Sequence, residues 1–464
     1  MKAIKTGMLW IDNKDLDDRL FDNIIHSYTY RHPMEQDDTF STYVLLKDRI
    51  GIPAGDADKV KRIFVDNELT IEDKSVAPVC SNDIHLTGLT LRPYQEEALS
   101  ETLDYFNDGG TTFNLSGNPG SGKSILISAI LSKLNVKTLI IAHLSMLTTQ
   151  LYNEISTFTD ADVKILNADD TELGDVNIAT SQFISKHPEI WYKIKKDIGL
   201  IIVDEAETIG SLTTLRILQR AHAKYRIAVT ATFTRSIDGR TPALIDMIGT
   251  KVITLVNDKL LKPTIICVNC DEYFSAPTNK LWYKRALMSF YKKNADSIHY
   301  KVITIARASL EKGRQVLIAA DVAILQEGIA EELEGLGIPC GIMNKDTKKA
   351  QRDQILLDYS AGKIKVLLGF GVLNAGLSIP KITTIIRVAT PGNTEKLEQL
   401  IGRGRRDFEG KEGMWLFDLM FSGFRYQNSK RLSMYRKKVE EDGWTLSQTS
   451  WSNLEKKMQP LDKS

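Results

Sequence analysis

The stretch TTFNLSGNPGSGKSILISAILSKL, residues 111–134, decides the fold class of this 464-residue chain. An apolar run typical of a strand leads into a glycine-rich loop, and an apolar helical pattern follows. The loop fits the pattern GxxxxGK[ST], in which glycines let successive backbone N–H groups face phosphate oxygens at the start of a helix. A glycine loop without a ligand is the alternative, and the Lys-Ser pair at the expected offset argues against it.

Each residue of this loop receives an expected role. We expect Lys123 to meet the β- and γ-phosphates of a nucleotide and Ser124 to bind Mg²⁺. The other nucleotide contacts are expected from the loop residues Gly117, Asn118, Pro119, Gly120, Ser121 and Gly122. The sequence therefore predicts a nucleotide and Mg²⁺ site at the end of this strand.

A second motif, VDEAE at residues 203–207, ends the apolar run GLIIV. Its carboxylates are expected at the carboxyl edge of a parallel sheet, where ligands bind in such folds. We expect Asp204 to bind Mg²⁺ and Glu205 to activate water. Paired carboxylates after a strand are by themselves more typical of a solvated loop. The phosphate loop earlier in the chain favours a catalytic pair instead, because a nucleotide site needs a phosphate loop and carboxylates.

The rhythm of strands and helices predicts two α/β lobes. Short Ile/Val/Leu runs alternate with helical patterns from about residue 112, and the rhythm resumes after LLKPTIICV, which is typical of doubly wound parallel sheets. We therefore divide the chain into an accessory domain at 1–88, lobes at 89–262 and 263–420, and an extension at 421–464. In the accessory domain, the run at 41–64 predicts a hairpin followed by a helix.

The extension at 421–464 interleaves aromatic and basic residues. This composition fits a nucleic-acid surface. A helix that packs its aromatic residues on the second lobe and leaves a basic face in solvent is the favoured alternative.

Composition excludes several classes of protein. The net charge is +1, so global charge indicates no nucleic-acid or membrane partner. The apolar runs are too short to span a bilayer, and no secretory signal is evident. The cysteines Cys80, Cys267, Cys270 and Cys340 are too few for a disulfide framework, which fits a reducing cytosol. Cys267 and Cys270 form a CxxC, which we interpret as strand cysteines rather than a zinc or redox site. We expect a cytoplasmic monomer.

With these motifs in place, residues 90–410 resemble superfamily 2 helicases and translocases. LRPYQ at 91–95 is similar to the adenine-reading element of DNA-directed members, which implies that Arg92 and Gln95 lie against the base. TAT at 230–232 is similar to the third motif, which implies that Thr230 and Thr232 couple the nucleotide site to the nucleic acid. The resemblance implies two tandem RecA-like lobes, ATP and Mg²⁺.

QLIGRGRR at 399–406 matches the sixth motif of the same family. The match implies that Gln399 faces the γ-phosphate and that Arg403 and Arg406 are arginine fingers from the second lobe. Because a finger from the other lobe completes the site only on closure, hydrolysis would depend on lobe movement.

Strand-end loops provide the expected nucleic-acid contacts, since hydroxyls and backbone N–H groups suit phosphates. The resemblance places these contacts at His143, Leu144, Thr180, Ser181, Gln182, Asp321 and Gly371. It also places Gly376 at the nucleotide. The chain departs from the family pattern at His143 and Phe233, where many members have Pro, and at Ser378, where many have Asp.

The motifs DEAE, TAT and LRPYQ move the resemblance away from DEAD-box RNA helicases and toward the DNA-remodelling group of RecG and the phage UvsW-like branch-migration helicases. The implied partner is DNA with forked, branched or single-stranded regions, in replication, recombination or repair. An RNA helicase and the motor of a restriction system are the enzyme alternatives. A binding module with ATP as a structural switch is disfavoured, because such a module needs neither a water activator nor two fingers.

Overall fold

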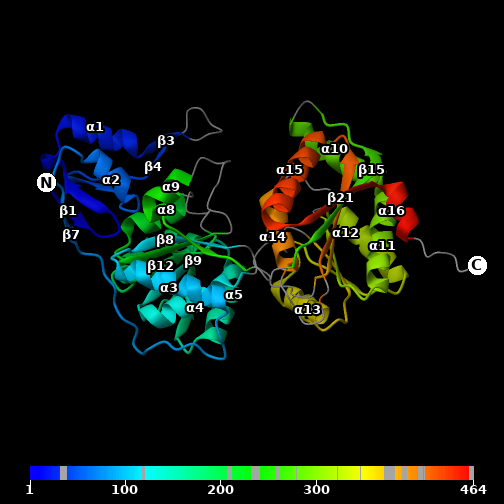
Figure 1. Cartoon of the computed structure of the whole chain (residues 1–464), viewed down its shortest axis with the longest axis horizontal. Helices are drawn as coiled ribbons and strands as arrows, with labels where there is room; N and C mark the ends of the chain where they lie inside the picture. The colour runs from blue at the N-terminus through cyan, green and yellow to red at the C-terminus, as the bar shows by residue number, and fades with distance from the viewer. Residues whose placement is uncertain are drawn as a thin grey trace, which may run out of the picture. The chain divides into compact units, whose positions relative to one another are not determined.

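The computed structural model describes residues 1–31, 39–117, 121–205, 212–230, 241–257, 261–277, 280–320, 322–344, 346–369, 382–388, 394–405, 411 and 413–458. The chain divides into two compact units, Met1–Asn257 and Asp258–Ser464 (Figure 1). Each unit contains a seven-stranded sheet whose strands are all parallel, so the predicted α/β class with two parallel-sheet lobes is confirmed.

The first unit begins with a small domain built on a mixed five-stranded sheet, in the order β5-β6-β2-β1-β7. Its strands are β1 (Lys2–Lys5), β2 (Leu9–Asp12), β5 (Val44–Leu45), β6 (Arg49–Ile52) and β7 (Thr70–Asp73). The remaining elements are η1 (Asn13–Asp15), α1 (Asp18–Ser27), α2 (Ala57–Ile63) and the antiparallel pair β3 (Thr29–Arg31) and β4 (Thr39–Ser41). β5 and β6 pair antiparallel and α2 follows, which confirms the predicted hairpin and helix.

The parallel sheet of the first unit follows the order β10-β11-β9-β12-β13-β8-β14. The strands are β8 (Thr112–Gly117), β9 (Thr138–Ala142), β10 (Val163–Ile165), β11 (Val176–Thr180), β12 (Leu200–Val203), β13 (Tyr225–Thr230) and β14 (Val252–Leu255). The helices are α3 (Pro93–Asn107), α4 (Lys123–Leu134), α5 (Ser145–Phe158), α6 (Ser181–Lys186), α7 (Pro188–Ile194), α8 (Leu212–Arg220) and α9 (Thr241–Ile248).

Both faces of this sheet are buried, which explains why its strands read as continuous apolar runs. Ile140 packs in a core with side chains of α3, α4 and α5. Leu139 and Ile141 point to the other face, into a core with side chains of α6 to α9. The alternation along β9 therefore divides helices between two layers.

The small domain docks on the parallel-sheet domain through a buried carboxylate on α9. Asp246 is 2 % exposed and accepts hydrogen bonds from Tyr30 and Thr42 of the small domain. Lys59 of α2 places its Nζ 2.7 Å from the Asp246 Oδ1 atom. The two domains of this unit thus share one buried ion pair.

The second unit has a parallel sheet in the order β17-β18-β16-β19-β20-β15-β21. The strands are β15 (Thr264–Tyr273), β16 (Val316–Ala319), β17 (Cys340–Ile342), β18 (Val366–Leu368), β19 (Thr384–Val388), β20 (Trp415–Ser422) and β21 (Thr445–Ser450). The helices are α10 (Lys280–Lys293), α11 (Ala295–Glu311), α12 (Ala323–Gly335), α13 (Lys349–Ser360), α14 (Thr394–Gly404), α15 (Arg425–Asp442) and α16 (Trp451–Met458).

Cys267 and Cys270 both lie in β15, on opposite faces of this sheet. Cys267 packs in the core that contains side chains of α13, α14 and α15, and Cys270 packs in the core that contains α10, α11 and α12. Both thiols are free, and burial raises the pKa of Cys270 to about 12. The interpretation as strand cysteines is confirmed.

The segment after residue 421 belongs to the second sheet. β21 pairs in parallel with β15 and forms the edge of the sheet. Four of its aromatic residues are buried, namely Phe424, Tyr435, Trp444 and Trp451. The alternative in which these aromatic residues pack on the second lobe is thus confirmed for these four. No helix in the described part of the chain has the length and hydropathy that a bilayer crossing requires.

Candidate nucleotide-binding site

The phosphate loop lies between β8 and α4, as the sequence predicts. β8 ends at Gly117 and α4 begins at Lys123. Gly122 has a φ of 87°, in the left-handed region, and a Cβ atom there would lie 2.4 Å from Gln95 Nε2. A Cβ atom on Gly117 would lie 2.7 Å from Ser121 Oγ. The left-handed backbone therefore favours glycine at 122, and at both positions the missing Cβ lets a neighbouring side chain approach the backbone closely.

Two polar groups of the loop fit an anionic ligand. Lys123 Nζ donates a hydrogen bond of 2.6 Å to the Gly117 carbonyl, which holds the ammonium beside the loop at the start of α4. The Ser121 hydroxyl is buried and has no hydrogen-bond partner among the residues that the structure describes. A helix amino terminus, an ammonium group and an unpaired buried hydroxyl together suit phosphate oxygens.

The LRPYQ element packs directly on this loop. Pro93 begins α3, where its missing N–H costs nothing. Gln95 is 1 % exposed, and its Oε1 accepts a 3.0 Å hydrogen bond from the Arg92 backbone N–H. The Tyr94 hydroxyl donates to the Ser121 carbonyl at 3.0 Å. The element and the loop are thus one structural assembly.

Tyr94 is the residue of this site that the sequence analysis missed. A tyrosine between a proline and a glutamine on an amphipathic helix has no distinctive sequence signal, and only its contact with Ser121 reveals the role. The exposed Arg92 side chain lies at the amino end of α3, and its contact with a base remains a prediction.

The DEAE motif follows β12 at the same carboxyl edge. The Asp204 backbone N–H donates to the Ile141 carbonyl at 3.0 Å, which continues the pairing of β12 with β9. Glu205 has a φ of 52°, in the left-handed region that non-glycine residues rarely adopt. Both residues are half-buried.

The sheet order connects this motif with the phosphate loop. β13 lies between β12 and β8, and Thr230 at its end is buried and pairs with Ser116 of β8. The phosphate loop, the first threonine of TAT and the DEAE carboxylates therefore end adjacent strands at one edge.

The donor set at this edge fits Mg²⁺. Ser124 and Asp204 offer a hydroxyl and a carboxylate, which are oxygen ligands, and Mg²⁺ is usually bound by one or two carboxylates together with substrate phosphates. Within the described ranges there is no group of three or more His, Cys, Asp or Glu side chains able to hold a metal without a substrate. When bound, the ion would neutralise phosphate charge.

The predicted nucleic-acid contacts of the first unit also lie at strand ends. His143 and Leu144 follow β9, and Leu144 is 39 % exposed. Thr180 ends β11, and its Oγ1 accepts a hydrogen bond from Phe183 N that caps α6. Ser181 is 6 % exposed, so its side chain offers little surface, whereas Gln182 is exposed. Contact of these residues with DNA remains a prediction.

Several predicted residues lie outside the described part of the structure. These are Asn118, Pro119, Gly120, Thr232, Asp321, Gly371, Gly376 and Arg406. The backbone of Gln399 and Arg403 lies in α14, and their side chains are not described. The roles of all these residues stay predictions.

Two family models match the chain. The model described as "Type III restriction enzyme, res subunit" matches residues 88–235. The model described as "Helicase conserved C-terminal domain" matches residues 298–407. The first match contains the phosphate loop and DEAE, and the second contains the sixth motif.

Curated relatives are also helicases by name. "Probable helicase D10" of Escherichia phage T5 is 26 % identical over 378 residues, which cover 81 % of this chain and 80 % of the relative. "Putative mitochondrial ATP-dependent helicase irc3" of Schizosaccharomyces pombe is 27 % identical over 353 residues, which cover 71 % of this chain. The match spans 57 % of irc3.

Solved structures share the fold. Saccharomyces cerevisiae Dbp5 bound to RNA and ADP BeF3 matches 80 % of this chain and 98 % of its own, with a TM-score of 0.54 and 13 % identity. The Type ISP restriction-modification enzyme LlaBIII bound to DNA matches 78 % of this chain and 31 % of its own, with a TM-score of 0.58 and 15 % identity. The two parallel-sheet lobes are thus tandem RecA-like helicase lobes.

The site and these findings together define the class of protein. A nucleotide site at the carboxyl edge of the first RecA-like lobe, followed by a second such lobe, is the arrangement of an ATP-dependent motor. The matches to both helicase models and to the phage relative support a superfamily 2 helicase that uses ATP.

Proposed function

We propose that this chain is an ATP-dependent DNA helicase or translocase that unwinds or branch-migrates forked and junction DNA, in the manner of the phage UvsW-like enzymes. The observation that carries the proposal is that three motifs meet at one edge of the first parallel sheet. Thr230 ends a strand there, Lys123 and Asp204 follow strands, and Gln95 packs against the phosphate loop. A relative from phage T5 supports a role in phage replication, recombination or repair.

Residues of both units divide the work of hydrolysis in this proposal. Lys123 holds the transferred phosphate, and Ser124 and Asp204 would hold the metal that neutralises phosphate charge. Glu205 accepts the proton of the attacking water. Arg403 and Arg406 belong to the second unit, so we infer that turnover requires both units.

DNA is favoured over RNA as the substrate by two observations. The LRPYQ element resembles that of DNA-directed members, and the first family model is that of a restriction enzyme subunit. No base-reading motif is evident, so we expect binding that tolerates sequence and weakens strongly with salt.

The test is ATPase activity measured in parallel without nucleic acid and with fork DNA, a four-way junction, single-stranded DNA and RNA. We expect DNA to stimulate hydrolysis, with branched DNA at least as effective as linear DNA, and unwinding of the fork. Stronger stimulation by RNA than by any DNA would contradict the DNA assignment.

The second candidate is the motor component of a restriction system, which the printed description of the first family model favours. Such a motor would translocate on linear duplex DNA. Displacement of a triplex-forming strand from linear duplex, without unwinding of forks or junctions, would select this candidate over the first.

A further inference from the structure

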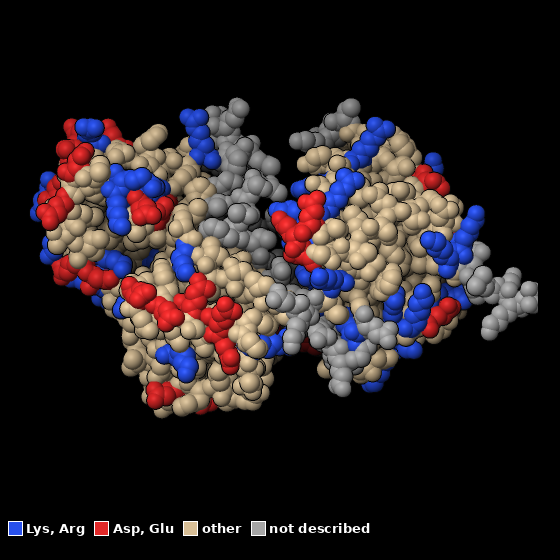
Figure 2. Space-filling model, viewed as in Figure 1, with Lys and Arg blue, Asp and Glu red and all other residues tan. Residues whose placement is uncertain are grey.

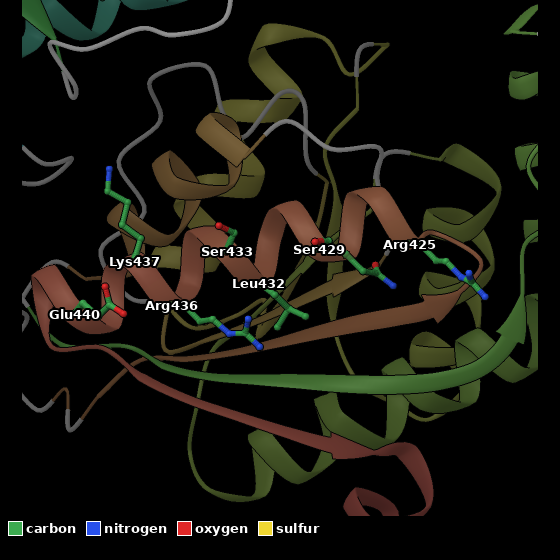
Figure 3. A pocket seen from close by; sticks show the side chains of 8 residues that line it. Arg425, Ser429, Leu432, Ser433, Arg436, Lys437 and Glu440 are labelled. Carbon is green, nitrogen blue, oxygen red and sulfur yellow. The ribbon is translucent and has the colours of Figure 1, made fainter.

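One face of α15 presents a polar stripe that the nucleotide site does not use. The exposed positions recur at helical spacing, and an open groove of about 810 Å³ lies along them. Figure 3 shows the side chains that line this groove along the helix. The stripe consists of Arg425, Ser429, Ser433, Arg436, Lys437 and Glu440.

The opposite face of α15 is fixed to the sheet. Asp418 of β20 is fully buried. One of its carboxylate oxygens accepts a 2.8 Å hydrogen bond from Arg431 Nε and a 2.9 Å hydrogen bond from the Tyr435 hydroxyl. Arg387 of β19 donates to the other oxygen of Asp418 at 3.0 Å. Because this anchor sets the rotation of the helix, the exposed stripe is held in a defined direction.

The stripe carries more positive than negative charge. Within the described ranges, Arg425 and Arg436 have no ion-pair partner. Lys437 Nζ lies 3.6 Å from Glu441 Oε1, and both side chains of this pair are exposed to solvent. The serines between them are small and allow close approach of a chain. Arg425 and Arg436 are about 16 Å apart along the helix axis at 1.5 Å per residue, a length that spans several nucleotides. Figure 2 shows blue and red side chains over the part of the second unit where Figure 1 draws α15.

Exposed aromatic residues lie on elements that meet near the amino end of the same helix. Tyr426, Trp282 and Tyr273 are 75 %, 53 % and 68 % exposed, unusual values for such large rings. Each is next in sequence to a residue of a contact network between elements, namely Gln427, Tyr283 and Phe274. Phe274 stacks on Phe424 with centroids 4.3 Å apart, Phe274 packs edge-on against Tyr283, and Gln427 donates to the Tyr283 hydroxyl.

We propose that the α15 stripe and these aromatic rings form a contact surface for single-stranded nucleic acid. Phosphates would pair with Arg425, Arg436 and Lys437, and a base would stack on Tyr426. Basic side chains that follow a backbone, with aromatic rings beside them, are the chemistry of sequence-tolerant single-strand binding. The inference rests on the proposed nucleic-acid motor and adds a surface outside its motifs.

The charge variant is Arg425→Ala, Arg436→Ala and Lys437→Ala combined in the full chain. The matched control removes three exposed lysines shortly before the strands β16 and β18 of the same sheet, namely Lys312, Lys363 and Lys365. Affinity for a fluorescent single-stranded oligonucleotide is measured by anisotropy from 0.05 to 0.3 M salt. Each lost phosphate contact reduces the salt slope by about 0.7, so we expect the slope to fall by about 2 and affinity to fall on the order of 10- to 100-fold.

The stacking variants are Tyr426→Ala and Tyr426→Phe. Loss of one base stack is expected to weaken single-strand binding by about 5- to 100-fold in Tyr426→Ala. Tyr426→Phe keeps the ring and should bind like wild type. An equal loss of single-strand affinity in both variants would overturn the stacking role, because the hydroxyl and not the ring would then make the contact.

The outcomes separate this inference from the proposed function. If wild-type protein binds no nucleic acid, the proposed function fails. If wild type binds and the charge variant keeps the wild-type slope and affinity, only the α15 surface is refuted. Loss of binding to duplex but not to single strands would also refute it, because duplex DNA would then be the occupant. Circular dichroism and melting temperature verify that each variant is folded.

Discussion

At the scale of single residues, the backbone of Glu205 is the most informative feature of the site. Its φ of 52° places a residue with a Cβ atom in the left-handed region, at a cost of about 1–2 kcal/mol. Such strain persists where the surrounding structure over-determines the conformation and is concentrated at functional sites. This left-handed residue lies two positions after the end of β12, at the position assigned to the water activator.

The role of Glu205 is tested with Glu205→Gln. Nucleotide affinity should survive, because the shape of the side chain is kept, whereas turnover should fall by about 10²- to 10⁴-fold with the loss of the base. Steady-state ATPase and nucleotide titration measure the two effects, and Glu172→Gln, on an exposed glutamate of the same unit, is the control. Near-normal turnover would remove Glu205 from the assignment.

The close approach at Gly122 is tested against a glycine of similar conformation. Gly122→Ala and Gly109→Ala both place Cβ at positive φ, 87° and 89°, so each should lower the free energy of unfolding by about 1 kcal/mol. Only the Cβ at 122 meets Gln95, whereas nothing lies within 4 Å at 109. Nucleotide binding should therefore be lost in Gly122→Ala alone, and equal affinities in the two variants would speak against the loop geometry.

At the scale of elements, α15 joins the anchor in the sheet to the helix of the sixth motif. Lys438 Nζ lies 2.7 Å from Glu398 Oε1 of α14, and Arg405 lies 3.7 Å from Asp442 at the end of α15. The Arg405 guanidinium also stacks over Trp444. α14 carries Gln399 and Arg403 of the sixth motif. Its orientation therefore depends on how α15 packs on the sheet.

The anchor itself is tested with Asp418→Asn. Burial raises the pKa of Asp418, but Arg431 and Arg387 more than offset this and hold its pKa below the ordinary value of 3.8. Removing the charge deprives two buried guanidinium groups of the carboxylate that they share, at an expected cost of about 3–5 kcal/mol in the free energy of unfolding. Urea unfolding measures it, with the exposed Asp353→Asn as control.

The sign of its pH dependence follows from the lowered pKa. The charged carboxylate stabilises the fold at pH values above 3.8, and this contribution is lost as the pH falls below that value through the folded-state pKa. The stability difference between wild type and Asp418→Asn should therefore shrink in acid. A difference that stays constant between neutral pH and pH 3 would contradict the ion-pair account.

Short and polar elements also show where sequence patterns lose power. β21 has the sequence TLSQTS, whose single leucine gives no apolar run, yet it forms an edge strand because β15 offers an open side for pairing. The phosphate loop and DEAE were predictable because their chemistry is local in sequence. The Asp418 anchor was not, because its partners lie 31, 13 and 17 residues away and only the fold brings them together.

At the scale of the whole molecule, the first unit is larger than a RecA-like lobe alone. Its parallel-sheet domain and its amino-terminal domain share the buried contacts of Asp246. Burial raises the pKa of this carboxyl, while Lys59, Thr42 and Tyr30 favour its charged form. The boundary between the two domains was expected near residue 88, but no sequence pattern pointed to an ion pair across it.

This joint is tested with Lys59→Ala. Loss of the ammonium leaves Asp246 buried without a cation, so the free energy of unfolding of the first unit should fall by about 3–5 kcal/mol. Lys61→Ala on the exposed face of the same helix is the control, with an expected change below about 0.5 kcal/mol. Deletion of the whole domain would uncover Asp246, so the point variant is the sharper probe. Equal melting temperatures for the two variants would refute a stabilising role for the Lys59–Asp246 ion pair.

The distance in sequence across this joint has a consequence for synthesis on the ribosome. Lys59 and Asp246 are 187 residues apart, so the amino-terminal domain leaves the ribosome long before the surface on which it docks. At about 5–20 residues per second, the interval is about 10 to 40 s. Throughout it, Lys59, Tyr30 and Thr42 face solvent or a chaperone instead of Asp246. Docking is thus a late step of maturation, and the nascent chain spends that interval with its joint open.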